Sequence, residues 1–286
     1  MNAALAMTAK EPISRDPDTS HPHVDVLGVK VSAVNMSEAV EIAERWIARG
    51  RPGYMCLTGV HGVMEAHANL QFRRILNSAV LNAPDGMPLS WIGHWQGHRE
   101  MDRVFGPDFM SAMCGISVAL GYRHFLYGGE AGVAESLQSV LEKRFPGLKV
   151  VGTYTPPFRE LNPAEEAELL TRIRTSSPHI IWIGLSTPKQ ERFMAAWRER
   201  LQVPLLVGVG AAFDFHTGRI QDSPRWIKRA GLQWLHRLIQ DPRRLARRYW
   251  RTHPAFLWQM ALHRANRGSL ANQEPNHCAA TTGSEM

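Results

Sequence analysis

Cysteine is scarce in this sequence, and the few cysteines present are too far apart to act together. The 286 residues include three of them, Cys56, Cys114 and Cys278. Their spacing matches neither a zinc site nor a disulfide framework, which argues against a disulfide-stabilised secreted domain. We therefore expect the protein to work in a reducing compartment.

Long apolar runs are missing as well. No uninterrupted apolar stretch reaches the ~20 residues that a membrane-spanning helix needs. Residues 1–22 carry polar residues and proline in place of the basic-then-apolar pattern of a secretory signal. We expect a cytoplasmic protein whose ends, residues 1–23 and 268–286, are disordered tails.

A pair of acids with metal-binding spacing is absent from the body of the chain. Asp16-Pro17-Asp18 has the Asp-x-Asp spacing that metal-using sugar-nucleotide transferases employ, but it lies in the proline-flanked N-terminal tail. Such a tail gives a cation no rigid shell of ligands. No Asp-x-Asp occurs further along the sequence. We therefore expect neither a metal site nor a cofactor.

Acidic residues are nearly absent from one segment near the C-terminus. From Arg225 to Arg267 there are eleven basic residues and one acid, Asp241, so this segment carries +10 in a chain whose net charge is +7. The segment is also rich in tryptophan, and Asp241-Pro242 marks the end of one helix and the start of the next. We expect an Arg/Trp-rich helical appendage over 223–267, suited to phosphate, an anionic membrane surface or nucleic acid.

What the sequence has in quantity is alternation between short apolar strands and helical segments. The helix expected over 37–50 shows the pattern, with Ser37 at its start, acids in its first turn and Gly50 at its end. Strands are expected at 54–58, 79–81, 124–128, 149–154, 179–184 and 204–210, after a strand or hairpin around Gly28. This order predicts an α/β core over 24–222, with a Rossmann-like, mostly parallel sheet flanked by helices.

Three turns that follow strands carry candidate ligand residues. Asp85 lies in the turn Asn82-Ala-Pro-Asp-Gly86, where it serves either as a helix N-cap or as a carboxylate base at the mouth of a pocket. Thr58 and His61 flank a glycine-containing turn that could approach a ligand closely. Gly128 and Gly129 form a loop before a helix, a plausible but unspecific cradle for phosphate.

Five stretches, taken in order, resemble one family. They are the Thr58 turn, Ala83-Pro84-Asp85-Gly86, Tyr127-Gly128-Gly129 running to Gly152, Gly184 to Pro188-Lys189-Gln190-Glu191, and Gly208-Val-Gly-Ala-Ala-Phe-Asp214 leading to Pro224-Arg225-Trp226 and Arg243-Arg244-Leu-Ala-Arg247. Over residues 26 to 252 the chain resembles the WecG/TagA/CpsF group, glycosyltransferase family 26. Each motif alone is weak, whereas their ordered set is specific.

The resemblance implies an inverting, metal-independent enzyme of bacterial surface polysaccharide synthesis. Such enzymes move a hexose-type sugar, N-acetylmannosamine, glucose or a related sugar, from a UDP-sugar to a polyprenyl-diphosphate-linked saccharide. The appendage would then dock on the inner face of the cytoplasmic membrane and complete the active site. The resemblance is also compatible with a homo-oligomer.

The same resemblance assigns roles to individual residues. Asp85 matches the catalytic base, and Thr58 and Gln190 match pocket residues near donor and acceptor. The arginines that would face the diphosphate of UDP are Arg237, Arg244 and Arg247. Many members carry Asn where this chain has Val60, and His61 is the residue that could substitute for it.

Two other functions compete with the transferase. A dinucleotide-dependent oxidoreductase is disfavoured, because Phe213 stands where Gly208-Val-Gly210 would need its third glycine. A nucleic-acid-binding module could use the Arg/Trp segment, although it would not need the α/β core with its candidate base. We expect no nucleic acid as a partner.

Overall fold

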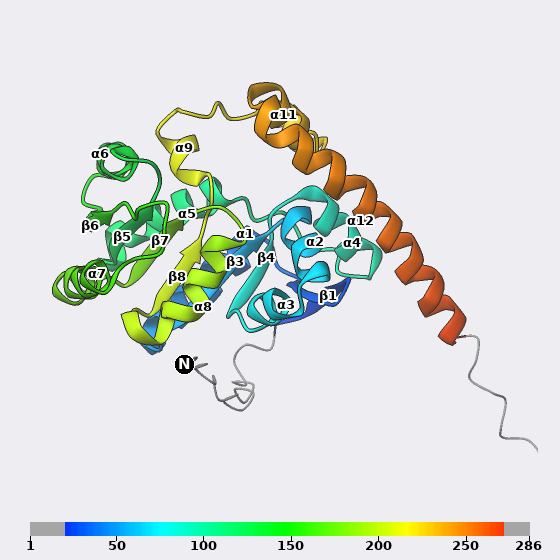
Figure 1. The fold of residues 1–286 in the computed structure, drawn as a ribbon, viewed down its shortest axis with the longest axis horizontal. Coiled ribbons are helices and arrows are strands. Elements are labelled where there is room, and N and C mark those ends of the chain that lie inside the picture. The colour runs from blue at the N-terminus through cyan, green and yellow to red at the C-terminus, as the bar shows by residue number, and fades with distance from the viewer. Residues whose placement is uncertain (1–20, 272–286) are drawn as a thin grey trace, which may run out of the picture.

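The computed structural model of this protein describes residues 21–271, without the side chains at 225, 229, 244, 248 and 264–271. Helices cover both faces of one central sheet (Figure 1). Its strands follow the order β4-β3-β8-β7-β5-β6, and every pairing among them is parallel. The strands are β3 (Gly53–Thr58), β4 (Leu81–Pro84), β5 (Arg123–Gly128), β6 (Lys149–Tyr154), β7 (Ile180–Gly184) and β8 (Leu205–Gly208). The predicted α/β fold is confirmed.

The sheet is buried on both faces, which explains why its strands read as continuous apolar runs. In β3, Met55 and Leu57 belong to one core and Tyr54 and Cys56 to the other, because successive side chains of a strand alternate. The first core is covered by α1 (Met36–Arg49), α5 (Gly106–Leu120) and α6 (Val133–Arg144). The second is covered by α2 (Val60–Ala68), α3 (Leu70–Asn77), α4 (Met87–Trp95), α7 (Pro163–Ser176) and α8 (Lys189–Leu201).

The strand order reverses beside β3, and this reversal positions the site. The chain leaves β3 for β4 on one side and later returns through β7 to β8 on the other side. Connections that depart in opposite directions leave a crevice at the carboxyl ends of the strands, the usual ligand position of open α/β sheets. Residues that directly follow β3, β4, β7 and β8 are therefore placed to meet.

An antiparallel hairpin lies beside β4, the edge strand of the large sheet. It comprises β1 (His23–Val26) and β2 (Val29–Ser32), with Gly28 between them at φ 85°. The backbone N–H of Asn82 donates to Ser32 Oγ at 3.1 Å, and the Asn82 side-chain amide donates to the carbonyl of Lys30 at 2.9 Å. The hairpin thus begins within the segment predicted as a disordered tail, whose residues 1–20 lie outside the described chain.

The C-terminal appendage consists of three helices, α10 (Arg225–Arg229), α11 (Gln233–Gln240) and α12 (Pro242–Ala271), which follow the short α9 (Ala212–His216). The predicted helix break at Asp241-Pro242 is confirmed. Helix α12 runs along one side of the core and packs against α2 (Figure 1). Leu245 and Phe256 are buried, so the long helix is attached by apolar contacts near its start and in its middle.

Two local predictions differ from the structure. The single helix expected to end at Asn77 is two helices, because the Asn69 side chain accepts a hydrogen bond from the Phe72 N–H and starts a new helix. Strand β4 begins at Leu81 and includes Pro84, so the turn contains only Asp85 and Gly86. Proline is tolerated there because β4 pairs on one side within its sheet.

Candidate active site

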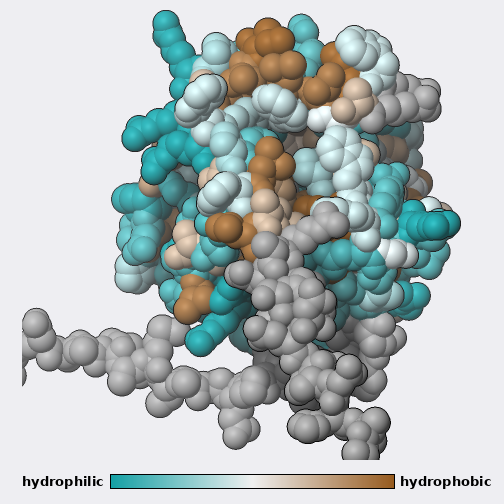
Figure 2. All heavy atoms as spheres, turned by 90° about the vertical axis from the view of Figure 1, so that its right-hand side faces the viewer, coloured by the Kyte–Doolittle hydropathy of each residue, from teal (hydrophilic) through white to brown (hydrophobic). Residues whose placement is uncertain are grey.

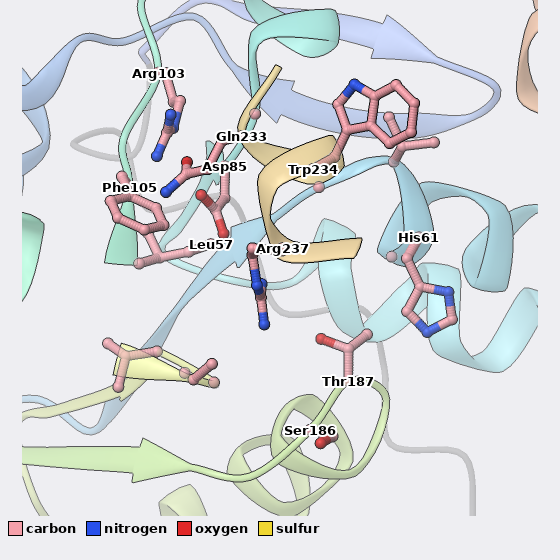
Figure 3. Close-up of a pocket in the computed structure, with 18 of the residues that line it drawn as sticks. Leu57, His61, Asp85, Arg103, Phe105, Ser186, Thr187, Gln233, Trp234 and Arg237 are labelled. Atoms are coloured by element: carbon pink, nitrogen blue, oxygen red, sulfur yellow. The ribbon is translucent and has the colours of Figure 1, made fainter. Parts of the chain in front are cut away.

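A pocket of about 290 Å³ opens at the carboxyl ends of the central strands. Its core wall consists of the turns after β3, β4, β7 and β8, at residues 59–62, 85–88, 184–187 and 208–211. Its opposite wall comes from α11 and α12 and contains Gln233, Trp234, Arg237, Tyr249 and His253. The site is therefore shared between the α/β core and the appendage (Figure 3).

The turn after β4 holds Asp85 at the edge of the sheet. The Asp85 N–H donates to the carbonyl of Thr58 at 2.8 Å, which joins this turn to the end of β3. A Cβ atom at position 59 would lie 2.9 Å from the Asp85 carbonyl oxygen, so only glycine permits this approach. Asp85 makes no cap for α4, whose N-cap is Gly86 without a side-chain hydrogen bond. Its carboxylate faces the pocket instead (Figure 3).

The surroundings of Asp85 favour a carboxyl group that titrates near neutrality. Burial raises its pKa from 3.8 to about 6, and the charge of Asp108 acts in the same direction. The guanidinium groups of Arg103 and Arg237 lower the pKa and so limit the rise. At pH 7 to 8 most Asp85 side chains are ionised, and the group remains basic enough to accept a proton.

Two arginines from different parts of the chain lie on either side of Asp85 (Figure 3). Arg103 precedes α5, and its guanidinium carbon lies 4.1 Å from the centre of the Phe105 ring. Its Nη2 atom is buried and has no hydrogen-bond partner among the described residues. Arg237 comes from α11 and lies 5.5 Å from the ring of Phe215. Guanidinium groups match the geometry of phosphate oxygens, so this pair suits a diphosphate.

Gln190 connects the turns after β7 and β8. Its Oε1 accepts a hydrogen bond from the Gly210 N–H at 3.0 Å, while its amide donates to Glu191 Oε1 at 3.0 Å. The Thr187 hydroxyl donates to the same carboxylate oxygen at 2.8 Å. Burial raises the pKa of Glu191, whereas these two hydrogen bonds lower it. The buried acid thus holds two pocket-lining side chains in fixed positions.

The predicted site residues divide into three groups. Asp85, His61, Gln190 and Arg237 line the pocket. Thr58 lies behind it, buried, with its hydroxyl donating to Asn82 Oδ1 at 2.5 Å. The third group comprises the predicted residues that do not line the pocket or whose side chains are not described, namely Gly128, Gly129, Arg247 and Arg244.

Gly128 ends β5 and Gly129 directly follows it, and neither is among the residues that line the pocket. A Cβ atom at position 128 would lie 2.7 Å from the carbonyl oxygen of Gly184, so this glycine permits close packing of β5 against β7. Arg247 is exposed on α12 and is not a lining residue. The side chain of Arg244 is among those that the structure does not describe.

Sequence reasoning missed several lining residues. Arg103, Gln233, Trp234, Tyr249 and His253 all line the pocket, yet none of them belongs to the set of pocket residues that the sequence predicts. Helical spacing could have grouped some of them, since Trp234 and Arg237 are three residues apart on α11. Among the described residues, no three His, Cys, Asp or Glu side chains are arranged to hold a metal ion.

The outer side of the appendage exposes large apolar side chains. Trp250 is 85% exposed and Trp226 is 68% exposed. Figure 2 shows apolar residues gathered at the top of one face, at the level where Figure 1 places α11. The exposed residues of and next to α11 include Leu232, Leu235 and Ile239. None of the helices within the described part of the chain is long and apolar enough to cross a membrane.

Comparison with known proteins gives a consistent result. The chain is 26% identical over 173 residues to a Bacillus subtilis protein, covering 60% of this chain and 66% of that one. It is 28% identical over 184 residues to a Bacillus spizizenii protein, covering 64% and 69%. Both relatives are named N-acetylglucosaminyldiphosphoundecaprenol N-acetyl-beta-D-mannosaminyltransferase, and the first is matched over slightly less than two thirds of its length.

A family match covers far more of the chain than either relative does. Residues 24–269 match the glycosyl transferase WecG/TagA/CpsF family, from β1 almost to the end of α12. The match therefore includes both walls of the pocket, with Asp85 on one and Arg237 on the other. This chain belongs to the WecG/TagA/CpsF family of glycosyltransferases.

Proposed function

We propose that this protein transfers a hexose-type sugar, with inversion and without a metal, from a UDP-sugar to a saccharide linked to polyprenyl diphosphate. The observation that carries the proposal is the position of Asp85 between Arg103 and Arg237 in a pocket of a chain from this family. N-acetylmannosamine is the first donor sugar to test, because both relatives are named for its transfer. Glucose and related sugars are the alternatives.

The proposed chemistry needs a base and a stabilised leaving group. Asp85 would accept the proton of the acceptor hydroxyl as that oxygen attacks the anomeric carbon, while the bond from this carbon to the UDP oxygen breaks. Attack from the face opposite the leaving group inverts the anomeric centre. The departing diphosphate gains negative charge, which Arg103, Arg237 and the N-termini of α2 and α4 would stabilise.

A direct assay tests this proposal. The protein is incubated with UDP-N-acetylmannosamine or UDP-glucose and a lipid-linked N-acetylglucosaminyl diphosphate, with and without excess EDTA. We expect release of UDP and an extended lipid product in both conditions, with an inverted anomeric configuration by NMR. Calorimetric titration with UDP and with NAD provides the control. Binding of NAD but not UDP, or steeply salt-dependent binding of RNA or DNA alone, would contradict the transferase.

We also propose that the appendage attaches the protein to the inner face of the cytoplasmic membrane. Tryptophan side chains favour the membrane interface, and arginines favour anionic lipid headgroups. Trp226, Trp250 and Trp258 are each more than 60% exposed in a segment with a net charge of +10. This attachment would bring the pocket to the lipid-linked acceptor.

Vesicle co-sedimentation tests the membrane attachment. We expect binding to vesicles that contain phosphatidylglycerol, weaker binding at high salt, and a clear loss of binding in a Trp250→Ala/Trp258→Ala variant. Phe158→Ala is the matched control, since Phe158 is 94% exposed but follows β6 in the core. Equal binding by all three proteins would remove these tryptophans from the attachment surface.

A further inference from the structure

Three aromatic rings gather on the appendage wall of the pocket. Trp234 comes from α11, and Tyr249 and His253 come from α12, where they lie four residues apart and share one face. The ring centre of Trp234 is 5.3 Å from that of His253 and 5.9 Å from that of Tyr249. The rings of Tyr249 and His253 are 5.0 Å apart and perpendicular. Each ring contacts the other two.

This ring cluster is accessible from the pocket. Trp234 is 38% exposed although it lines a concave site, and Tyr249 and His253 are partly buried. Burial lowers the pKa of His253 below its ordinary value, although the contact of its Nδ1 with the carbonyl oxygen of Tyr249, at 3.3 Å, acts in the opposite direction. The net shift favours the uncharged imidazole. A neutral ring beside two others forms an uncharged surface opposite the charged part of the pocket.

We propose that these three rings form the subsite for the pyranose ring of the acceptor, an inference that rests on the proposed transferase function. The electron-rich face of an aromatic ring attracts the slightly positive C–H groups on one face of a pyranose. The surrounding groups fit the sugar's other edges, because Gln233, Arg237 and His61 line the same pocket and can bond hydroxyl groups.

The position of the rings favours the acceptor over the donor. The turns on the core wall present backbone groups and the N-termini of α2 and α4, which suit the nucleotide diphosphate. The rings belong to the same two helices that carry exposed Leu235, Ile239 and Trp250. A lipid-linked acceptor held at that surface would enter the pocket past the rings.

Kinetics with Trp234→Ala test the subsite. The donor is the UDP-sugar, and the acceptor is a water-soluble short-chain analogue of lipid-linked N-acetylglucosaminyl diphosphate, which removes any effect of membrane attachment. We expect the KM for the acceptor to rise about tenfold, as the loss of an aromatic contact predicts. The affinity for UDP should stay unchanged by calorimetry. Trp234→Phe, which retains a ring, should recover most of the acceptor affinity.

Two further variants keep the test decisive. Tyr249→Leu keeps an apolar side chain but removes a second ring, and it should raise the acceptor KM severalfold even if Trp234→Ala fails to fold. Phe158→Ala, an exposed aromatic residue outside the pocket, should behave as wild type.

The possible results separate this inference from the proposed function. If the wild-type protein transfers no sugar, the transferase proposal itself fails. If the wild type is active and the Trp234 and Tyr249 variants keep a normal acceptor KM, the subsite is wrong. A loss of UDP affinity equal to the loss of acceptor affinity would also overturn it, because the rings would then support α11 or stack on uracil.

Discussion

The two walls of the pocket differ in how their side chains are fixed. On the core wall, Gln190 is 2% exposed and hydrogen bonded to both Gly210 and Glu191. On the appendage wall, the Trp234 ring packs against the rings of Tyr249 and His253, and the Arg237 guanidinium lies over the ring of Phe215. The core wall is therefore preformed, whereas the appendage wall depends on how α11 and α12 pack.

The appendage is attached to the core by polar contacts at the surface and by buried apolar side chains. Gln240 exchanges two hydrogen bonds of 3.0 Å with the backbone of Gln221, and Lys228 pairs with Asp222. These contacts are at the surface, where polar pairs contribute little to stability. Leu245 and Phe256 supply the buried apolar anchor. These two buried side chains therefore anchor α12, which forms part of the appendage wall.

The largest expected effect comes from the core wall. Asp85→Asn keeps the size of the side chain but removes the group that would accept the acceptor's proton. We expect turnover to fall about 10²- to 10⁴-fold, the usual contribution of general base catalysis. The affinity for UDP, measured by calorimetry, should remain within a few-fold. Turnover near the wild-type rate would show that Asp85 is not the base.

A smaller effect is expected from the appendage wall. Arg237→Ala should weaken UDP binding by roughly 10- to 150-fold, as loss of charge-assisted hydrogen bonds of about 1.5–3 kcal/mol predicts. Arg247→Ala is the comparison, because the family resemblance gives both arginines the same role while only Arg237 lines the pocket. An effect of Arg247→Ala as large as that of Arg237→Ala would mean that the appendage rearranges around UDP.

The contrast between the walls also explains what the sequence could predict. Parallel strands bring the turns at their carboxyl ends to one edge of the sheet, so His61 and Asp85 could be placed there from the alternation of strands and helices. The family resemblance added Gln190, which also lines the pocket. Thr58 was assigned to the pocket with them, yet its side chain points to Asn82 behind it. Successive side chains of a strand point to opposite faces of the sheet, so a shift of one residue reverses the face on which a strand-end residue lies. A strand that is apolar on both faces does not show in its sequence which residues point to which face.

The appendage wall was much harder to predict. The sequence identified its helices and their charge, and Asp241-Pro242 located the break between them. The family resemblance named Arg237, which lines the pocket, together with Arg247, which does not. No pattern in the residues placed Trp234, Tyr249 or His253 at the pocket. Arg103 was missed for another reason: its role comes from the fold, which brings the segment before α5 next to Asp85.

A third prediction concerns stability and returns to the core wall. Because the pKa of Asp85 is raised from 3.8 to about 6, the folded protein binds more protons than the unfolded chain between these pH values. The free energy of unfolding therefore falls as the pH rises through that window. Asp85→Asn should be more stable than wild type by about 1–3 kcal/mol at pH 8, with no difference below pH 4. Urea unfolding at both pH values measures this.

The smallest expected effect is a shift in the pH dependence of kcat/KM, which tests whether Arg237 on the appendage wall changes the pKa of Asp85 on the core wall. Because Arg237 lowers the pKa of Asp85 across the pocket, kcat/KM of the wild type should rise with pH and level off above an inflection near pH 6. In Arg237→Ala, Arg103 alone of the two arginines still lowers the pKa of Asp85 against the effect of burial. The inflection of kcat/KM should therefore move to higher pH, by less than about one unit.

Arg247→Ala is the control for this shift, since Arg247 is not among the charges that act on Asp85. It should leave the inflection where the wild type has it. An unchanged inflection in Arg237→Ala, together with the expected loss of UDP affinity, would mean that the arginine reaches the diphosphate without approaching the base. The appendage would then recognise the donor, and the reactivity of the carboxylate would be set by the core alone.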